Sequence, residues 1–121
     1  MLINLSNHPY EFWSENQREV ASQFGEVIDL PFPNISPDAT TDQLLPLIDE
    51  YYNRVVAYGD NSRVVVHLMG EMTFTFMLVA RLLQANYRCI SSTTERIVKN
   101  STATGEKTVL FQFINFRDYQ I

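Results

Sequence analysis

Hydrophobic residues along the chain occur in two patterns, short continuous runs and stripes spaced three or four residues apart. Continuous apolar runs bounded by turn residues indicate buried strands, whereas the wider spacing indicates amphipathic helices. Runs of the first kind occupy residues 1–6, 26–30, 63–69 and 87–92, and helical stripes fill the intervals between them. Because helical crossovers join parallel strands in a right-handed winding, this order predicts a mostly parallel sheet.

Capping residues mark the ends of the expected helices. Ser14 and Gln17 fit a reciprocal capping box at the start of the first helix, and Gly25 fits a left-handed cap after its end. Thr40 or Thr41 is expected to cap the second helix in the same way. The first two helices are therefore expected to begin and end close to the limits of their apolar stripes.

The C-terminal part is expected to form an antiparallel hairpin. Residues 97–98 and 109–116 flank a polar, glycine-containing loop at 100–105, while residues 93–96 are interpreted as the loop that follows the fourth strand. The complete prediction is an α/β fold, a three-layer Rossmann-like sandwich whose sheet is mostly parallel and ends in this hairpin. Residues 64–68 should form its central strand.

Composition narrows the class of protein. A length of 121 residues fits one domain spanning residues 1–121, and 45% hydrophobic residues suffice for a core. Cys89 is the only cysteine, so no internal disulfide is expected. No signal-peptide pattern and no membrane-length apolar run occur, which predicts a cytoplasmic protein with no membrane partner. The net charge of −5 argues against duplex nucleic acid but leaves a small anionic ligand open.

Four polar segments are expected at one edge of the sheet. In an open α/β sheet, ligands bind outside the carboxyl ends of the parallel strands, and the segments there are 7–9, 31–33, 70–73 and 93–96. Backbone N–H groups and the third helix's N-terminus favour an anion, and an arginine fork suits phosphate. The candidate ligand-binding residues are Asn7, Gly70, Thr73, Thr93, Thr94 and Arg96.

Each candidate also has a purely structural interpretation. Gly70 fits a tight turn, and Thr73 is favoured as the cap of the third helix. His8 before a proline is typical of a turn, and His67 within a valine-rich strand is favoured as a hydrogen-bonded core histidine. The convergence of the four segments carries more weight than any single residue.

Several kinds of chemistry lack their sequence signatures. No G-x-G-x-x-G, G-x-x-x-x-G-K-[ST] or G-x-S-x-G motif is present. One cysteine and two histidines at unrelated spacings indicate no zinc site, so neither a metal nor a cofactor is expected. A phosphoacceptor domain would require a carboxylate cluster where this chain has Asn7 and Gly70.

Four segments together resemble a group of small CRISPR-associated proteins with a CARF-type fold, namely residues 4–9, 70–74, 92–96 and 111–119. The resemblance implies a stand-alone, homodimeric protein that binds, and in the ring-nuclease case cleaves, a cyclic oligoadenylate messenger of type III CRISPR antiviral signalling. It implies metal-independent cleavage by a ribose 2′-hydroxyl, positioned by the protein. His8 or Glu71 would then accept the proton, and the ligand-binding candidates would hold phosphates.

Two alternatives remain open on the sequence. The first is a non-enzymatic dimeric interaction module, in which a surface around Tyr51, Tyr52, Phe116 and Tyr119 forms the interface. The second is an enzyme acting on another small phosphorylated metabolite. Binding of cyclic oligoadenylates, together with analysis of the products, would separate these two alternatives from the cyclic-oligoadenylate hypothesis.

Overall fold

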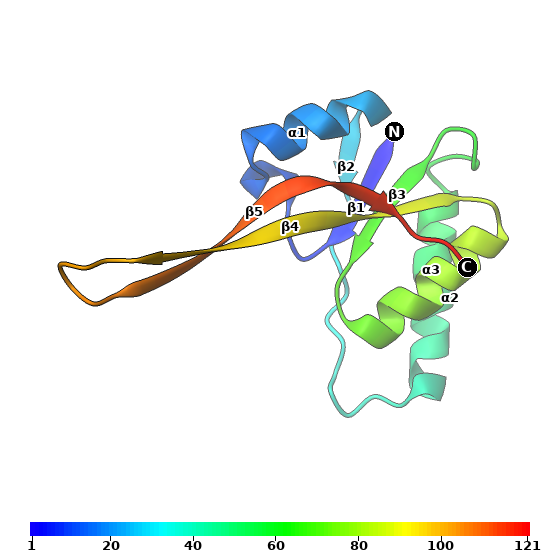
Figure 1. Cartoon of the computed structure of the whole chain (residues 1–121). Coiled ribbons are helices and arrows are strands. Elements are labelled where there is room, and N and C mark those ends of the chain that lie inside the picture. Colours follow the sequence, from blue (N-terminus) through cyan, green and yellow to red (C-terminus); the bar gives the residue numbers. More distant parts are fainter.

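The computed structural model describes all 121 residues and has one five-stranded sheet of order β2-β1-β3-β4-β5 (Figure 1). The first four strands in this order are parallel neighbours, and β5 runs antiparallel to β4. The strands are β1 (Leu2–Ser6), β2 (Val27–Asp29), β3 (Val65–Met69), β4 (Arg88–Asn100) and β5 (Lys107–Asp118). The predicted α/β fold is therefore confirmed, with β3 at the centre of the sheet.

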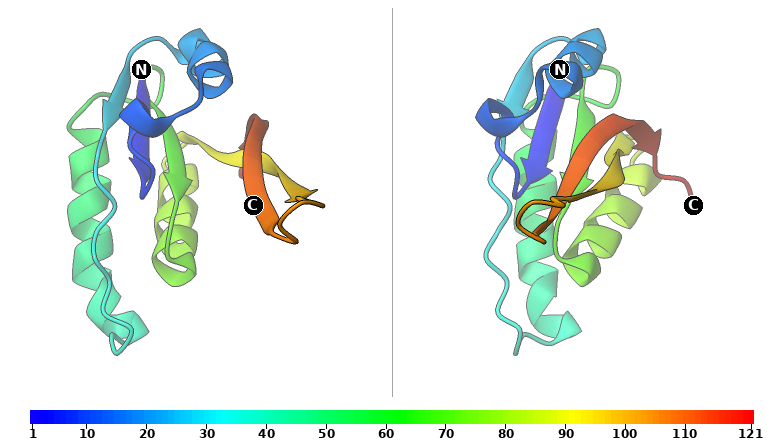
Figure 2. Two further views of the ribbon diagram at one scale, coloured as in Figure 1. Left: turned by 90° about the vertical axis from the view of Figure 1, so that its left-hand side faces the viewer. Right: turned by 60° about the vertical axis from the view of Figure 1, so that its left-hand side comes forward.

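Helices cover both faces of this sheet. They are α1 (Glu15–Ala21), α2 (Thr41–Val56) and α3 (Met72–Gln84), with short 3-10 turns η1 (Tyr10–Phe12) and η2 (Ser22–Phe24). Figure 2 shows α1 on the opposite side of the sheet from α2. The larger core, beneath α2 and α3, includes Ile3, Leu5, Val66, Leu68 and Leu78. The smaller core, beneath α1, consists of Leu2, Trp13, Ala21 and Ile90. None of the helices has the length and hydrophobicity that a bilayer crossing requires.

The helix caps agree only partly with the predictions. Thr40 and Gln43 form a complete capping box on α2, and Gly25 closes the first helical segment at φ +87°. The Ser14 hydroxyl accepts from the Gln17 N–H as expected, but the Gln17 side chain reaches Ser92 instead of returning to the helix start. The predicted reciprocal box on α1 is therefore wrong in its second half.

The start of α3 also differs from the prediction. Glu71, not Thr73, is the cap, and its carboxylate accepts from the backbone N–H groups of Thr73 and Phe74. These two bonds lower the pKa of Glu71 from its ordinary value. Glu71 is thus held in its charged form by the helix that it begins.

The expected loop at residues 93–96 is instead part of one long strand. β4 continues without interruption to Asn100, pairing with β5 along its length, with a bulge between Thr93 and Thr94. Thr93, Thr94, Ile97 and Val98 are β-branched residues that favour a strand. The far part of this hairpin extends well beyond the body of the molecule (Figure 1). We call residues 94–112 the arm.

The aromatic surface expected for an interaction module is largely buried. Tyr51 belongs to the core, and Tyr52 and Tyr119 pack against it. Phe116 packs against the core under α1, and the Tyr119 hydroxyl donates to the Leu68 carbonyl. The most exposed large apolar side chains lie on η1, α3, the arm and the chain end, and they are Phe12, Met72, Phe76, Phe111 and Ile121.

Gly70, directly after β3, is required by close packing. A Cβ atom at this position would overlap the ring of Phe32, which itself packs edge-on against Phe74 with ring centroids 5.1 Å apart. We expect Gly70→Ala to lower the free energy of unfolding by about 1–3 kcal/mol, the usual cost of overpacking. Urea denaturation measures the change. Adding Phe32→Leu should restore part of it, and equal stability of Gly70→Ala and wild type would contradict this packing argument.

Candidate functional site

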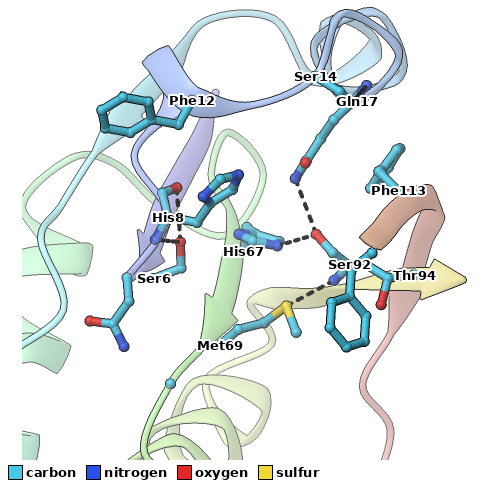
Figure 3. A pocket seen from close by; sticks show the side chains of 13 residues that line it. Ser6, His8, Phe12, Ser14, Gln17, His67, Met69, Ser92, Thr94 and Phe113 are labelled. Carbon is cyan, nitrogen blue, oxygen red and sulfur yellow. Dashed lines mark hydrogen bonds between the residues drawn. The ribbon is translucent and has the colours of Figure 1, made fainter. Parts of the chain in front are cut away.

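A cleft of about 580 Å³ opens at the carboxyl ends of β1 and β3, beside the middle of β4 (Figure 3). In the strand order 2-1-3-4, the chain reverses its winding direction between β1 and β3, and ligands of open α/β sheets bind at such a point. The size lies within the ordinary range of ligand pockets, about 300–1,000 Å³. The lining residues are Ser6, Asn7, His8, Phe12, Ser14, Gln17, His67, Met69, Gly70, Ser92, Thr94, Phe111 and Phe113.

A row of polar side chains crosses the sheet at the floor of this cleft. Asn4 lies in register with Asp29 on one side and His67 on the other. Because side chains alternate along a strand, Ser6 and Ser92 emerge on the same face, beyond the apolar Leu2 and Ile90. The face under α1 is thus apolar at the beginning of the strands and polar at their ends.

Hydrogen bonds fix the orientation of the Asn4 side chain. Its Nδ2 donates to Asp29 Oδ1 at 2.8 Å and to the His8 carbonyl at 2.9 Å. Its Oδ1 accepts from the Ser6 hydroxyl at 2.8 Å. The two groups that accept from Nδ2, a carboxylate and a carbonyl, have no proton to donate. The nitrogen and oxygen of the Asn4 amide therefore cannot exchange places.

The Asn4 orientation determines which tautomer His67 adopts. His67 Nδ1 lies 2.9 Å from Asn4 Oδ1, an acceptor, so Nδ1 carries the proton. His67 Nε2 is then an acceptor, and it lies 2.7 Å from the Ser92 hydroxyl, which donates to it. The Gln17 amide donates to the same Ser92 oxygen at 3.2 Å (Figure 3). The hydrogen bonds from Asn4 to His67, Ser92 and Gln17 therefore have a defined donor and acceptor at every step.

His67 is neutral over the physiological pH range. Its side chain is 2% exposed, and burial, followed by the charge of His8, lowers its pKa from 6.5 to about 4. Trp13 contributes to this burial, with its ring 5.4 Å from the His67 ring and its Nε1 donating to the His8 carbonyl. A neutral imidazole with a free Nε2 lone pair can accept a proton.

The walls of the cleft are aromatic and carry no permanent charge. Phe12 and Phe111 are 66% and 69% exposed and flank the cleft together with Phe113. No lysine, arginine, aspartate or glutamate is among the lining residues, and His8 is the exposed ionisable one. Such walls suit flat, uncharged groups that stack on aromatic rings and form hydrogen bonds.

The structure brings together four of the residues expected in the site. Asn7, His8, Gly70 and Thr94 line the cleft. The other expected residues do not: the Thr93 hydroxyl bonds to the Asn115 backbone, and Arg96 lies on the arm opposite Phe111. Glu71 and Thr73 form the start of α3, outside the cleft wall.

Sequence reasoning missed the buried floor of the cleft. Asn4 and Ser92 were not singled out, Gln17 was assigned only to a cap, and His67 was favoured as a core residue. The signal that could have found them is a polar residue within an apolar strand, as Asn4 is in β1, His67 in β3 and Ser92 in β4. No group of three or more histidine, cysteine, aspartate or glutamate side chains could hold a metal ion.

Comparison with known proteins identifies the family of this chain but no activity, substrate or partner. The sequence model described as the Uncharacterized protein MJ1673 family matches residues 1–117, nearly the whole chain. Neither a curated protein nor a solved structure matches the chain. The geometry of the cleft is therefore the observation that bears on function.

Proposed function

We propose that this chain, which belongs to the uncharacterized MJ1673 family, binds a cyclic oligoadenylate in the cleft at the ends of β1 and β3, beside the middle of β4. It would act as a messenger sensor or ring nuclease in type III CRISPR signalling. The observation that carries the proposal is the cleft's position at the winding reversal, combined with its stacking and hydrogen-bonding walls. The resemblance of four segments to small CARF-type proteins supports the choice of ligand.

Adenine bases fit the aromatic walls. Stacking on an exposed aromatic ring contributes about 1–3 kcal/mol per base and is available from Phe12 and Phe111. Asn7, Ser14 and Thr94 offer donors and acceptors for base edges and ribose hydroxyls. These features favour a nucleotide over a small, highly charged metabolite, because no lysine or arginine lines the cleft to bind the charges of such a metabolite.

The phosphates need positive charge that the cleft walls lack. The arm carries Arg96, Lys99 and Lys107, none of which lines the cleft of its own chain. We propose that two copies form a homodimer around the ring, so that the arm of one copy approaches the open cleft of the other. Arg96 would then contact a phosphate of the ligand, which a two-fold arrangement presents to both copies alike.

If the ring is cleaved, His8 is the proton acceptor. His8 lies in the cleft wall, whereas the Glu71 carboxylate is engaged by the N–H groups of α3. The ribose 2′-oxygen would attack the adjacent phosphorus and its proton would pass to His8, while the bond from phosphorus to the 5′-oxygen breaks and that oxygen takes a proton from water. The product would be a linear oligoadenylate with a 2′,3′-cyclic phosphate.

Incubation with cyclic tri-, tetra- and hexaadenylate tests the proposal. Calorimetry should detect binding of at least one ring, and Phe111→Ala should weaken it about ten-fold through loss of stacking. Arg96→Ala should weaken it by about ten- to a hundred-fold, with little change in thermal stability. Phe76→Ala, an equally exposed ring on α3 outside this cleft, is the matched control. Failure of the wild type to bind any of the rings refutes the proposal.

A second candidate function is that of an interaction module. Met72, Phe76 and Ile121 line an apolar groove of about 340 Å³ between α3 and the chain end. Large exposed apolar patches mark interaction surfaces in many proteins. Sedimentation of the ligand-free protein tests this candidate: self-association abolished by Phe76→Ser, combined with no binding of cyclic oligoadenylates, would favour it.

A further inference from the structure

We propose that Ser92 is a reactive nucleophile towards uncharged carboxylic esters, with His67 as its general base and Asn4 as the residue that orients His67. This inference concerns the floor of the cleft and does not depend on binding of a cyclic oligoadenylate. It rests on two contacts that join residues of three neighbouring strands, Asn4 of β1 to His67 of β3 and His67 to Ser92 of β4.

The hydrogen bonds point in the direction that activates a serine. The Ser92 hydroxyl donates to His67 Nε2 at 2.7 Å, and His67 Nδ1 donates to Asn4 Oδ1 at 2.9 Å. A serine, a base within hydrogen-bond reach and a third group that orients the base are the parts of an activated nucleophile. Asn4 is itself held by Asp29, so the imidazole ring has one orientation.

Ser92 is accessible from the cleft, whereas its partners are not. Ser92 is half-buried and lines the cleft, while His67 and Asn4 are 2% and 1% exposed. A substrate that enters the cleft therefore meets the serine oxygen first. Figure 3 shows Ser92 between His67 and the Gln17 side chain.

Two donors beside Ser92 can stabilise negative charge on a carbonyl oxygen. The Gln17 amide lies 3.2 Å from the serine oxygen, and the Ser92 N–H donates to the Met69 sulfur, a weak acceptor. The Gln17 amide can turn to an oxyanion that forms above Ser92, whereas the Ser92 N–H is fixed in β4 and becomes available only when the Met69 sulfur moves aside. The absence of arginine and lysine from the lining residues favours an uncharged ester with a flat apolar group over a phosphate.

Hydrolysis of the ester at Ser92 would need water as its only other reactant. The Ser92 oxygen bonds to the ester carbonyl carbon while its proton passes to His67 Nε2. Collapse of the tetrahedral intermediate breaks the ester C–O bond, and the proton passes from His67 to the leaving alcohol. Water then attacks the acyl-serine, again giving a proton to His67, and the carboxylic acid leaves as the serine regains its proton.

An alkyl fluorophosphonate, which reports an activated serine without needing the natural ester, tests the proposal on the intact chain. The Ser92 oxygen should displace fluoride, adding one adduct per chain by mass spectrometry, mapped to Ser92. Ser92→Ala should give no adduct, and Ser91→Ala, the neighbouring serine outside the cleft, should react like wild type. His67→Gln should slow labelling by about 100-fold or more. No adduct, an adduct elsewhere, or equal rates for wild type and a folded His67→Gln protein would overturn the proposal.

The pH dependence of labelling tests the role of His67 and needs no variant. His8, beside the cleft, and Asp29, behind Asn4, are the ionisable groups that face this network. Because the pKa of His67 is about 4, the labelling rate of the wild type should stay constant from pH 8 to pH 5. A rate that falls over this interval would mean that the base is a group other than His67 and would contradict the proposed role of His67.

Discussion

Acidification from pH 7 to pH 4 is expected to lower the free energy of unfolding by about 3 kcal/mol through His67 alone. The pKa of His67 is about 4 in the folded protein, against 6.5 for an ordinary histidine, because burial opposes the charged form. The unfolded chain therefore binds a proton first as the pH falls. The stability is fully present above pH 6.5 and is lost progressively as the pH falls from 6.5 towards 4.

Urea denaturation of wild type and His67→Gln at pH 7, 5.5 and 4 measures this contribution. Glutamine has no titrating group, so the variant should lose about 3 kcal/mol less than wild type over the same interval. Carboxylates with lowered pKa values, such as Glu71, contribute equally to both proteins and cancel in the comparison. Parallel pH profiles for the two proteins would show that His67 is not buried as a neutral ring.

The fold could be predicted from sequence because its signals are local. Apolar runs mark β1, β2 and β3, and Thr40 and Gly25 mark helix ends through their own side chain or backbone conformation. The parallel order then follows from the helical connections. The hairpin of residues 97–98 and 109–116 was likewise predictable, and the antiparallel pairing of β4 with β5 confirms it. Residues 93–96 carry no apolar side chain, so no apolar run or alternation marks them as a strand. Residues 93–96 therefore looked like a loop, and Arg96 was placed at a strand end that does not exist.

The floor of the cleft could not be predicted because it depends on register. Asn4, His67 and Ser92 meet only because Asn4 pairs with His67, which pairs with Ile90, two residues before Ser92. A shift of one residue in either pairing would send these side chains to opposite faces. Each residue alone is ordinary, and His67 is a hydrogen-bonded core histidine as the sequence indicated. What the sequence did not show is that its partner is a serine open to solvent.

Asn4→Asp is expected to be the most damaging isosteric change in the chain, lowering the free energy of unfolding at pH 7 by about 3–5 kcal/mol. The new carboxylate would be nearly fully buried. It would face the Asp29 carboxylate and the His8 carbonyl, both of which now accept from Asn4 Nδ2. Two donated bonds become repulsions, while the bonds from Ser6 and His67 remain.

The reciprocal exchange Asn4→Asp/Asp29→Asn is the control that isolates this repulsion. The amide at position 29 could donate to the carboxylate at position 4, which restores one of the two lost bonds, so about half of the lost stability should return. Asp29→Asn alone should cost no more than about 1–2 kcal/mol, because Asp29 is exposed and its partners remain polar. A carboxylate beside His67 Nδ1 should also raise the pKa of His67 above its present value and strengthen it as a base. Denaturation of the four proteins gives the coupling energy, and a coupling near zero would mean that the hydrogen bond from Asn4 to Asp29 contributes nothing to stability.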